Sequence, residues 1–86
     1  MQKQHDDALT RRFETILDTG MVFIHWSEIR RWYDIQRVSK ATFRDMLMRW
    51  NELTNSKQGE LMCVRGPANE GMWLYAEKSS EKVENL

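Results

Sequence analysis

The stretch from Val38 to Leu53 constrains the fold most, because it combines a helix start signal with a helical repeat of apolar residues. At Ser39, a side-chain oxygen can accept a hydrogen bond from a backbone N–H of the first helical turn. Apolar side chains then recur at Phe43, Met46, Leu47, Trp50 and Leu53. Because this spacing places them on one face of a helix, we expect that face to pack against a core.

The opposite face of this expected helix is polar and basic near its N-terminus, and it carries Lys40, Thr42, Arg44 and Arg49. A helix of this kind is suited to a nucleic-acid groove. We expect the first three side chains to lie near base edges and Arg49 to lie closer to a phosphate, with Ser39 donating to a phosphate at the helix start. The alternative is a charged face in solvent, which Asp45 on the same face favours.

The charges balance over the whole chain but not along it. Thirteen Lys and Arg residues match 13 Asp and Glu residues, and this zero net charge argues against a non-specific polyanion binder. Residues 27–50 hold six basic residues against three acidic ones. A local basic region on a neutral protein fits sequence-selective DNA binding, in which we expect phosphates to be held by Arg30, Arg31 and Arg37.

Two further helices and a short strand are expected before residue 38. The first helix starts at Asp6 or Asp7 and ends at Gly20, because a carboxylate caps a helix start and glycine accepts the left-handed backbone of a helix end. Its expected core residues are Leu9, Phe13, Ile16 and Leu17, and its exposed cations are Arg11 and Arg12. Residues 21–24 predict a brief strand. The second helix starts at His25 or Ser27, with Trp26, Ile29, Trp32 and Tyr33 facing the core.

Residues 60–77 predict a β-hairpin. Its strands are residues 60–65 and 72–77, and residues 66–71 between them contain two glycines and the only proline of the chain. Alternation along the second strand places Met72, Leu74 and Ala76 on one face, which we expect to be the core face, and Trp73 and Tyr75 on the other. The aromatic pair either forms a partner surface or is covered by the first helix.

The residues Val38-Ser39-Lys40-Ala41-Thr42-Phe43 resemble the start of the recognition helix in bacterial helix-turn-helix proteins, and the hairpin resembles the wing of the winged helix-turn-helix superfamily. The resemblance covers roughly residues 8–77. It implies an α+β fold of three helices with a small antiparallel sheet, and a third helix that enters the major groove of DNA. It also implies a wing whose tip, here near Arg65, enters the minor groove; a hairpin with only a structural role is the alternative.

This chain departs from the superfamily pattern at two positions. The tight turn before the recognition helix usually has Gly where this chain has Arg37, and the preceding helix usually has Ala where this chain has Tyr33. We therefore expect a longer turn than the standard one.

Length and composition limit the other classes of protein. The 86 residues predict one domain, residues 1–77, with a polar tail at 78–86. With Cys63 as its only cysteine, the chain forms no internal disulfide, and one cysteine with two histidines makes no usual zinc set. No apolar run is long enough to span a membrane. We expect a cytoplasmic protein with no catalytic site, metal or cofactor.

Two functions remain open from the sequence. The first is a small transcriptional regulator that binds double-stranded DNA as a dimer at a pseudo-palindromic site. The second is a winged-helix adaptor that binds a protein, such as a phage or mobile-element accessory protein acting on a host machine. The high aromatic count and the zero net charge favour the second function, in which Trp73 and Tyr75 would contact the homodimeric or heteromeric partner.

Overall fold

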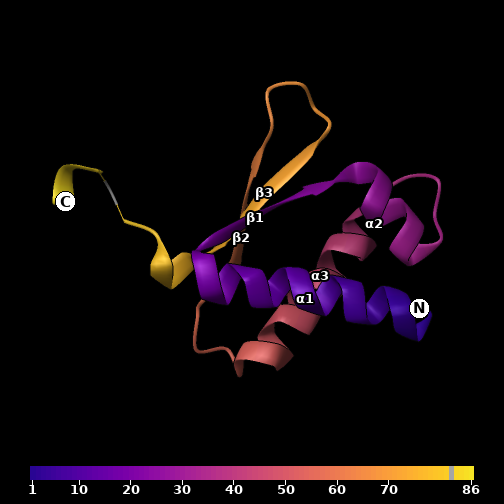
Figure 1. Cartoon of the computed structure of the whole chain (residues 1–86), viewed down its shortest axis with the longest axis horizontal. Helices are drawn as coiled ribbons and strands as arrows, with labels where there is room; N and C mark the ends of the chain where they lie inside the picture. The colour runs from indigo at the N-terminus through magenta and orange to yellow at the C-terminus, as the bar shows by residue number, and fades with distance from the viewer. Residues whose placement is uncertain (82) are drawn as a thin grey trace.

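A computed structural model, which describes residues 1–81 and 83–86, shows an α+β domain of three helices and a three-stranded antiparallel sheet (Figure 1). The elements in chain order are α1 (Lys3–Thr19), β1 (Met21–His25), α2 (Trp26–Tyr33), α3 (Lys40–Thr54), β2 (Leu61–Arg65) and β3 (Gly71–Ala76). Two short 3-10 turns, η1 (Glu77–Ser79) and η2 (Val83–Asn85), follow. The predicted fold class is confirmed: a helix-turn-helix is followed by a β-hairpin that projects beyond the helices.

The structure corrects the start of α1 and confirms its end. The helix begins at Lys3 rather than at Asp6 or Asp7, because the N–H groups of His5 and Asp6 already donate to the Gln2 carbonyl at 3.0 Å. At the other end Gly20 has a φ of 99°, and its N–H donates to the Ile16 carbonyl at 2.8 Å. Glycine adopts this left-handed conformation without a steric cost, so it ends the helix as predicted.

The turn between α2 and α3 is long, as the departures from the superfamily pattern predicted. Residues 34–39 separate the two helices, and Asp34 takes a left-handed conformation with a φ of 54°. Its N–H donates to the Arg31 carbonyl, and the Ile35 N–H donates to the Arg30 carbonyl. These bonds close the end of α2 and direct the chain toward the start of α3.

The sheet has the strand order β1-β3-β2, so β3 pairs with both other strands. Phe23 of β1 and Val64 of β2 lie on either side of Trp73. The even-numbered side chains of β3 are buried on the helical face, as predicted, and they are Met72, Leu74 and Ala76. Trp73 and Tyr75 lie on the opposite face, so α1 does not cover them.

The core lies between the sheet and the helices and is centred on Trp50. This indole is fully buried, and its ring meets the Phe13 ring edge to face with centroids 5.6 Å apart. Its Nε1–H donates to the Gly59 carbonyl at 3.3 Å, so the polar atom of the side chain is satisfied inside the core. The other core residues are Leu9, Ile16, Ile24, Ile29, Trp32, Met46, Met72, Leu74 and Ala76. Leu17, expected in the core, is 45% exposed.

Within residues 1–81 and 83–86, none of the helices has the length and apolar character that a membrane crossing requires. The same residues contain no group of three or more His, Cys, Asp or Glu side chains that could hold a metal ion.

Candidate nucleic-acid interface

The buried face of α3 differs from the predicted one by a rotation of the helix. Its buried residues are spaced four apart, at Thr42, Met46, Trp50 and Thr54. Phe43 and Leu47 are half-buried beside this row, and Leu53 is 39% exposed. The apolar side chains on which the prediction was based therefore lie on both sides of the buried row and not only along its centre.

This rotation removes Thr42 from the predicted DNA-contact residues. Its side chain is only 6% exposed, so it cannot reach a base edge, and the sequence-based expectation for it is wrong. Its hydroxyl lies 3.5 Å from that of Ser39, which occupies the N-cap position of α3. The Ser39 side chain makes no capping hydrogen bond to a backbone N–H, so it stays exposed at the helix start.

Arg49, for which a phosphate contact is predicted, is held by two carboxylates of the protein itself. Its Nε–H donates to Asp45 at 2.7 Å, and its Nη1 donates to Asp6 at 2.6 Å. The Tyr33 hydroxyl donates to the same Asp45 oxygen at 2.7 Å. These four side chains come from α1, α2 and α3, so the network ties the three helices together.

The pKa values of this network reflect its mutual hydrogen bonds. Burial, together with the hydrogen bond to Asp45, raises the pKa of the Tyr33 hydroxyl above its ordinary value. Burial opposes ionisation of Asp45, but the hydrogen bonds from Tyr33 and Arg49 outweigh it and hold the Asp45 pKa below its ordinary value. The hydrogen bond to Asp45 likewise raises the pKa of Arg49. The Asp45 carboxylate therefore stays ionised and is held by Tyr33 and Arg49.

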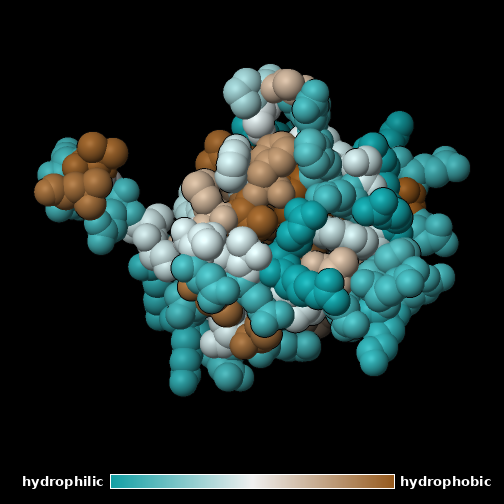
Figure 2. Space-filling model, viewed as in Figure 1, coloured by the Kyte–Doolittle hydropathy of each residue, from teal (hydrophilic) through white to brown (hydrophobic). Residues whose placement is uncertain are grey.

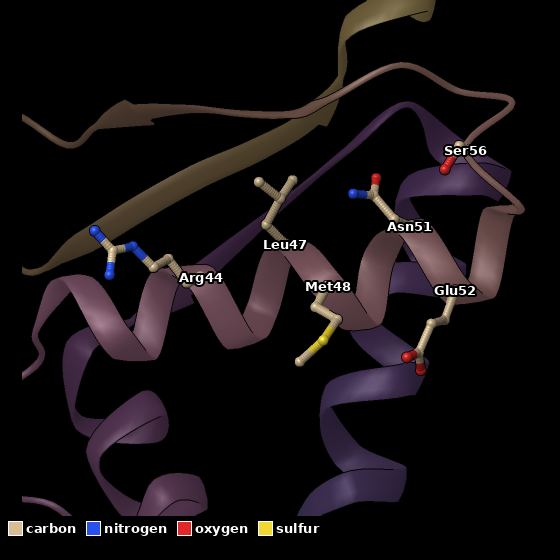
Figure 3. Close-up of a pocket in the computed structure, with 6 residues that line it drawn as sticks. All are labelled: Arg44, Leu47, Met48, Asn51, Glu52 and Ser56. Atoms are coloured by element: carbon tan, nitrogen blue, oxygen red, sulfur yellow. The ribbon is translucent and has the colours of Figure 1, made fainter.

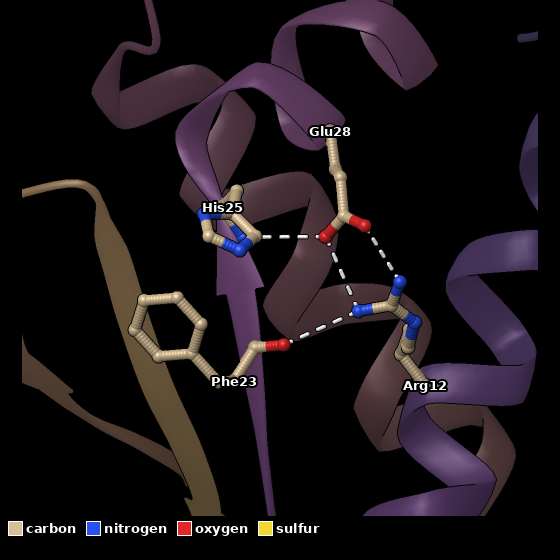
Figure 4. Close-up of polar contacts among 4 residues, drawn as sticks. All are labelled: Arg12, Phe23, His25 and Glu28. Carbon is tan, nitrogen blue, oxygen red and sulfur yellow. Dashed lines mark hydrogen bonds and ion pairs between the residues drawn. The ribbon is translucent and has the colours of Figure 1, made fainter.

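A second cation expected to be exposed, Arg12, also has a structural role (Figure 4). It donates to both oxygens of Glu28, at 2.7 and 3.2 Å, and to the Phe23 carbonyl at 3.2 Å. The His25 N–H donates to the same Glu28 carboxylate at 3.2 Å, which supports the start of α2 as the sequence predicted. Burial works against ionisation, yet these hydrogen bonds lower the pKa of Glu28.

The two networks take up most of the acidic side chains of α2 and α3. They use Glu28 and Asp45, which are two of the three carboxylates in residues 27–50. The other cations of this region have no carboxylate within ion-pair distance among the described residues, and all are exposed: Arg30, Arg31, Arg37, Lys40, Arg44 and, from the hairpin, Arg65. The free charge on this surface is therefore more positive than the sequence count suggests.

Three of these free cations gather around one pocket, which we call the arginine pocket. Arg30 of α2, Arg37 of the following turn and Arg65 of β2 line a hollow of about 360 Å³ together with Trp26 and Phe43. Gln36, Val38 and Asn69 complete its lining. The Arg65 guanidinium lies 5.9 Å from the centroid of the Trp26 ring, which holds the cation against an aromatic face. The pocket thus joins the hairpin to the helix-turn-helix.

The remaining free cations do not line this pocket. Lys40 and Arg44 occupy the exposed first turns of α3. Figure 3 shows Arg44 at one end of an open groove along α3 and Glu52 at the other, with Met48 between them. Arg31 lines a different hollow, beside Met1, Gln2 and His5, and so is separate from the arginine pocket.

The face of the sheet that is turned away from the helices is apolar. Figure 2 shows hydrophobic side chains gathered over the strands, with hydrophilic groups around them. Met21 is 44% exposed, Val64 52% and Trp73 40%, and the Phe23 and Trp73 rings meet with centroids 5.2 Å apart. The sequence identified Trp73 and Tyr75 but not their neighbours, since the register that joins Phe23 and Val64 to Trp73 is a property of the folded sheet.

No protein-family model matches the chain, and neither a curated protein nor a solved structure matches it.

Proposed function

We propose that this protein binds double-stranded DNA and acts in the cytoplasm as a small sequence-selective regulator of transcription. The observation that carries the proposal is the set of exposed cations without carboxylate partners around the α2–α3 turn, the start of α3 and the hairpin. These are Arg30, Arg37, Lys40, Arg44 and Arg65. They belong to the segments that would face a duplex if α3 entered its major groove.

In this proposal Lys40 and Arg44 read base edges, and the arginine pocket holds the sugar-phosphate backbone of the DNA. Arg can donate two hydrogen bonds to guanine in the major groove, and this contact discriminates between base pairs. Arg30 and Arg37, which line the pocket, hold phosphates in this proposal and so fix the register of the protein on the duplex. Arg65, which lines the same pocket, contacts the DNA strand that passes the hairpin in this proposal.

Two neighbouring arginines of α2 provide a matched test. Arg30 and Arg31 are both exposed and free of ion pairs among the described residues, but only Arg30 lines the arginine pocket. We expect Arg30→Ala to weaken binding to a short random-sequence duplex and to reduce the slope of log K against log salt by about 1, because one phosphate contact is lost. Arg31→Ala should keep the affinity and slope of the unaltered protein.

Fluorescence anisotropy of a labelled duplex, titrated at several salt concentrations, measures both quantities. The proposal fails if the unaltered protein does not bind the duplex. It also fails if its binding is insensitive to salt, or if Arg30→Ala and Arg31→Ala behave alike.

The apolar face of the sheet favours a second candidate, a protein-binding adaptor. Large exposed apolar side chains in one patch are typical of a partner surface. A Trp73→Ser variant separates the two functions, because its side chain lies on the sheet face away from the helices. DNA binding that survives this substitution supports the regulator. A protein partner that is captured by the unaltered chain but not by Trp73→Ser, with no duplex binding by either, supports the adaptor.

A further inference from the structure

The two outer strands of the sheet, β1 and β2, differ in whether the backbone groups on their free edges are hydrogen-bonded. On β1 these groups are bonded to side chains. The Trp26 N–H donates to the Glu70 carbonyl at 3.0 Å. Because hydrogen-bonded pairs alternate along antiparallel strands, the backbone N–H and C=O groups of the odd-numbered residues of β1 point away from β3. Side chains engage each of them. Thr19 donates to the Met21 carbonyl, Arg12 donates to the Phe23 carbonyl, and Glu28 accepts from the His25 N–H, all at 3.2 Å.

The free edge of β2 has no such cover. The Glu77 N–H donates to the Glu60 carbonyl at 3.0 Å, and the Gly66 N–H donates to the Gly71 carbonyl at 3.1 Å. The even-numbered residues of β2 therefore bond to β3, and the backbone groups of Leu61, Cys63 and Arg65 face outward. In the described part of the chain, no side chain or other segment forms a hydrogen bond with these outward groups.

The sequence of β2 also lacks the features that usually prevent strand edges from pairing. Leu61–Arg65 contains no proline and no lysine, and its one charge stands at the end of the strand. Cys63 and Val64 are exposed. A row of unpaired backbone groups beside exposed apolar side chains is a template for another strand.

We propose that a second copy of this chain pairs with β2, antiparallel, about a two-fold axis at Cys63. In this register Met62 lies opposite Val64 of the partner subunit, and Cys63 lies opposite Cys63 of the partner subunit. Leu61 lies opposite Arg65 of the partner subunit, so no two like charges oppose each other. The strand is thus complementary to itself, as a two-fold interface requires.

The apolar face of the sheet supports the same occupant. Val64 is beside Trp73 in the monomer, and Met62 is beside Tyr75. Pairing two β2 strands joins the two apolar faces into one surface across six strands, with Met62 and Val64 at its centre. This assembly does not depend on the proposed DNA binding, and its test measures mass instead of affinity for a duplex.

Opposite charges at position 63 test both the dimer and its register. Cys63→Lys places two cations opposite each other across the axis and Cys63→Glu places two anions there, so each variant alone should be monomeric. An equimolar mixture of the two should form a heterodimer, because a cation then faces an anion. Cys63→Ser, which keeps the backbone N–H and adds no charge, is the matched control and should dimerise like the unaltered chain.

Sedimentation equilibrium over a concentration series measures the mass. The proposal predicts that the unaltered chain and Cys63→Ser rise from 10.4 kDa to twice that mass as concentration increases, and that the mixture of charged variants does the same. Three results overturn it: an unaltered chain that stays at 10.4 kDa throughout, a Cys63→Lys variant that dimerises like the unaltered chain, or a mixture that stays monomeric.

Discussion

At the scale of single residues, Gly71 shows how closely the hairpin approaches the end of β1. A side chain on Gly71 would place its Cβ against the Ile24 carbonyl oxygen and 2.8 Å from the His25 Cα, both of which are backbone atoms that cannot move aside. Gly66, which pairs with Gly71 across the hairpin, has room, because its nearest neighbour would be a Phe23 ring carbon at 3.5 Å. The two glycines therefore differ in function although they close the same turn.

We expect Gly71→Ala to lower the free energy of unfolding by about 2 kcal/mol or more, because the backbone has to shift to relieve the clash. Gly66→Ala is the control and should change the unfolding free energy by less than about 1 kcal/mol. Urea unfolding followed by tryptophan fluorescence measures both. Equal effects of the two substitutions would show that the approach of the hairpin to β1 is not as close as described.

The lowered pKa values of Glu28 and Asp45 predict that the protein loses stability in acid. Hydrogen bonds lower the pKa of each carboxyl in the folded protein, so the unfolded chain binds more protons in the acid range. The resulting stabilisation is complete above the unfolded pKa values, near about 4, and it is lost as the pH falls through the lower folded values. We expect the free energy of unfolding to fall between about pH 5 and pH 2.

The variant Glu28→Gln measures how much the Arg12–Glu28 ion pair contributes to this loss of stability in acid. It should be less stable than the unaltered protein at pH 7 by about 1 kcal/mol, and the difference should shrink in acid, where Glu28 is protonated in both states. Thermal unfolding across the pH range measures this. A difference that stays constant with pH would contradict the stated role of the ion pair.

At the scale of elements, the sequence predicted the features that depend on neighbouring residues, such as a helix end and the alternation along a strand. Gly20 ends α1, and alternation along β3 buries Met72 and its even-numbered neighbours, both as predicted. The hairpin turn, predicted at residues 66–71, spans residues 66–70, because Gly71 pairs with His25 and starts β3. The start of α1 was missed because Asp6 binds Arg49, which is 43 residues away, and does not cap the helix. A contact across that distance leaves no local pattern in the sequence.

The rotation of α3 was missed for a related reason. Periodicity gives the direction of an apolar face to within about one residue, and Thr42 can join that face because its side chain is small and its hydroxyl has a neighbour in Ser39. The sequence therefore identified the helix and the exposed cations at positions 30, 37, 40, 44 and 65. It could not separate them from Arg31, Arg49 and Thr42, which the folded packing places elsewhere.

At the scale of the whole molecule, a chain with zero net charge exposes a basic surface because its carboxylates are used selectively. Arg12 and Arg49 take Glu28, Asp45 and Asp6 into contacts that join α1 to the rest of the fold. Of the cations of this region that remain free, Arg30, Arg37 and Arg65 line the arginine pocket, Lys40 and Arg44 lie at the start of α3, and Arg31 lines a separate hollow. We propose that the paired cations stabilise the fold and that the free cations bind DNA.

The most direct test compares two arginines of α3, Arg44 and Arg49, for both stability and duplex affinity. We predict that Arg44→Ala weakens duplex binding and changes the free energy of unfolding by less than about 0.5 kcal/mol, because its side chain is exposed and unpaired among the described residues. Arg49→Ala should lower that free energy by about 1–2 kcal/mol and leave the affinity of the folded protein unchanged. The opposite pattern, with Arg49→Ala weakening binding and Arg44→Ala destabilising the fold, would contradict the account.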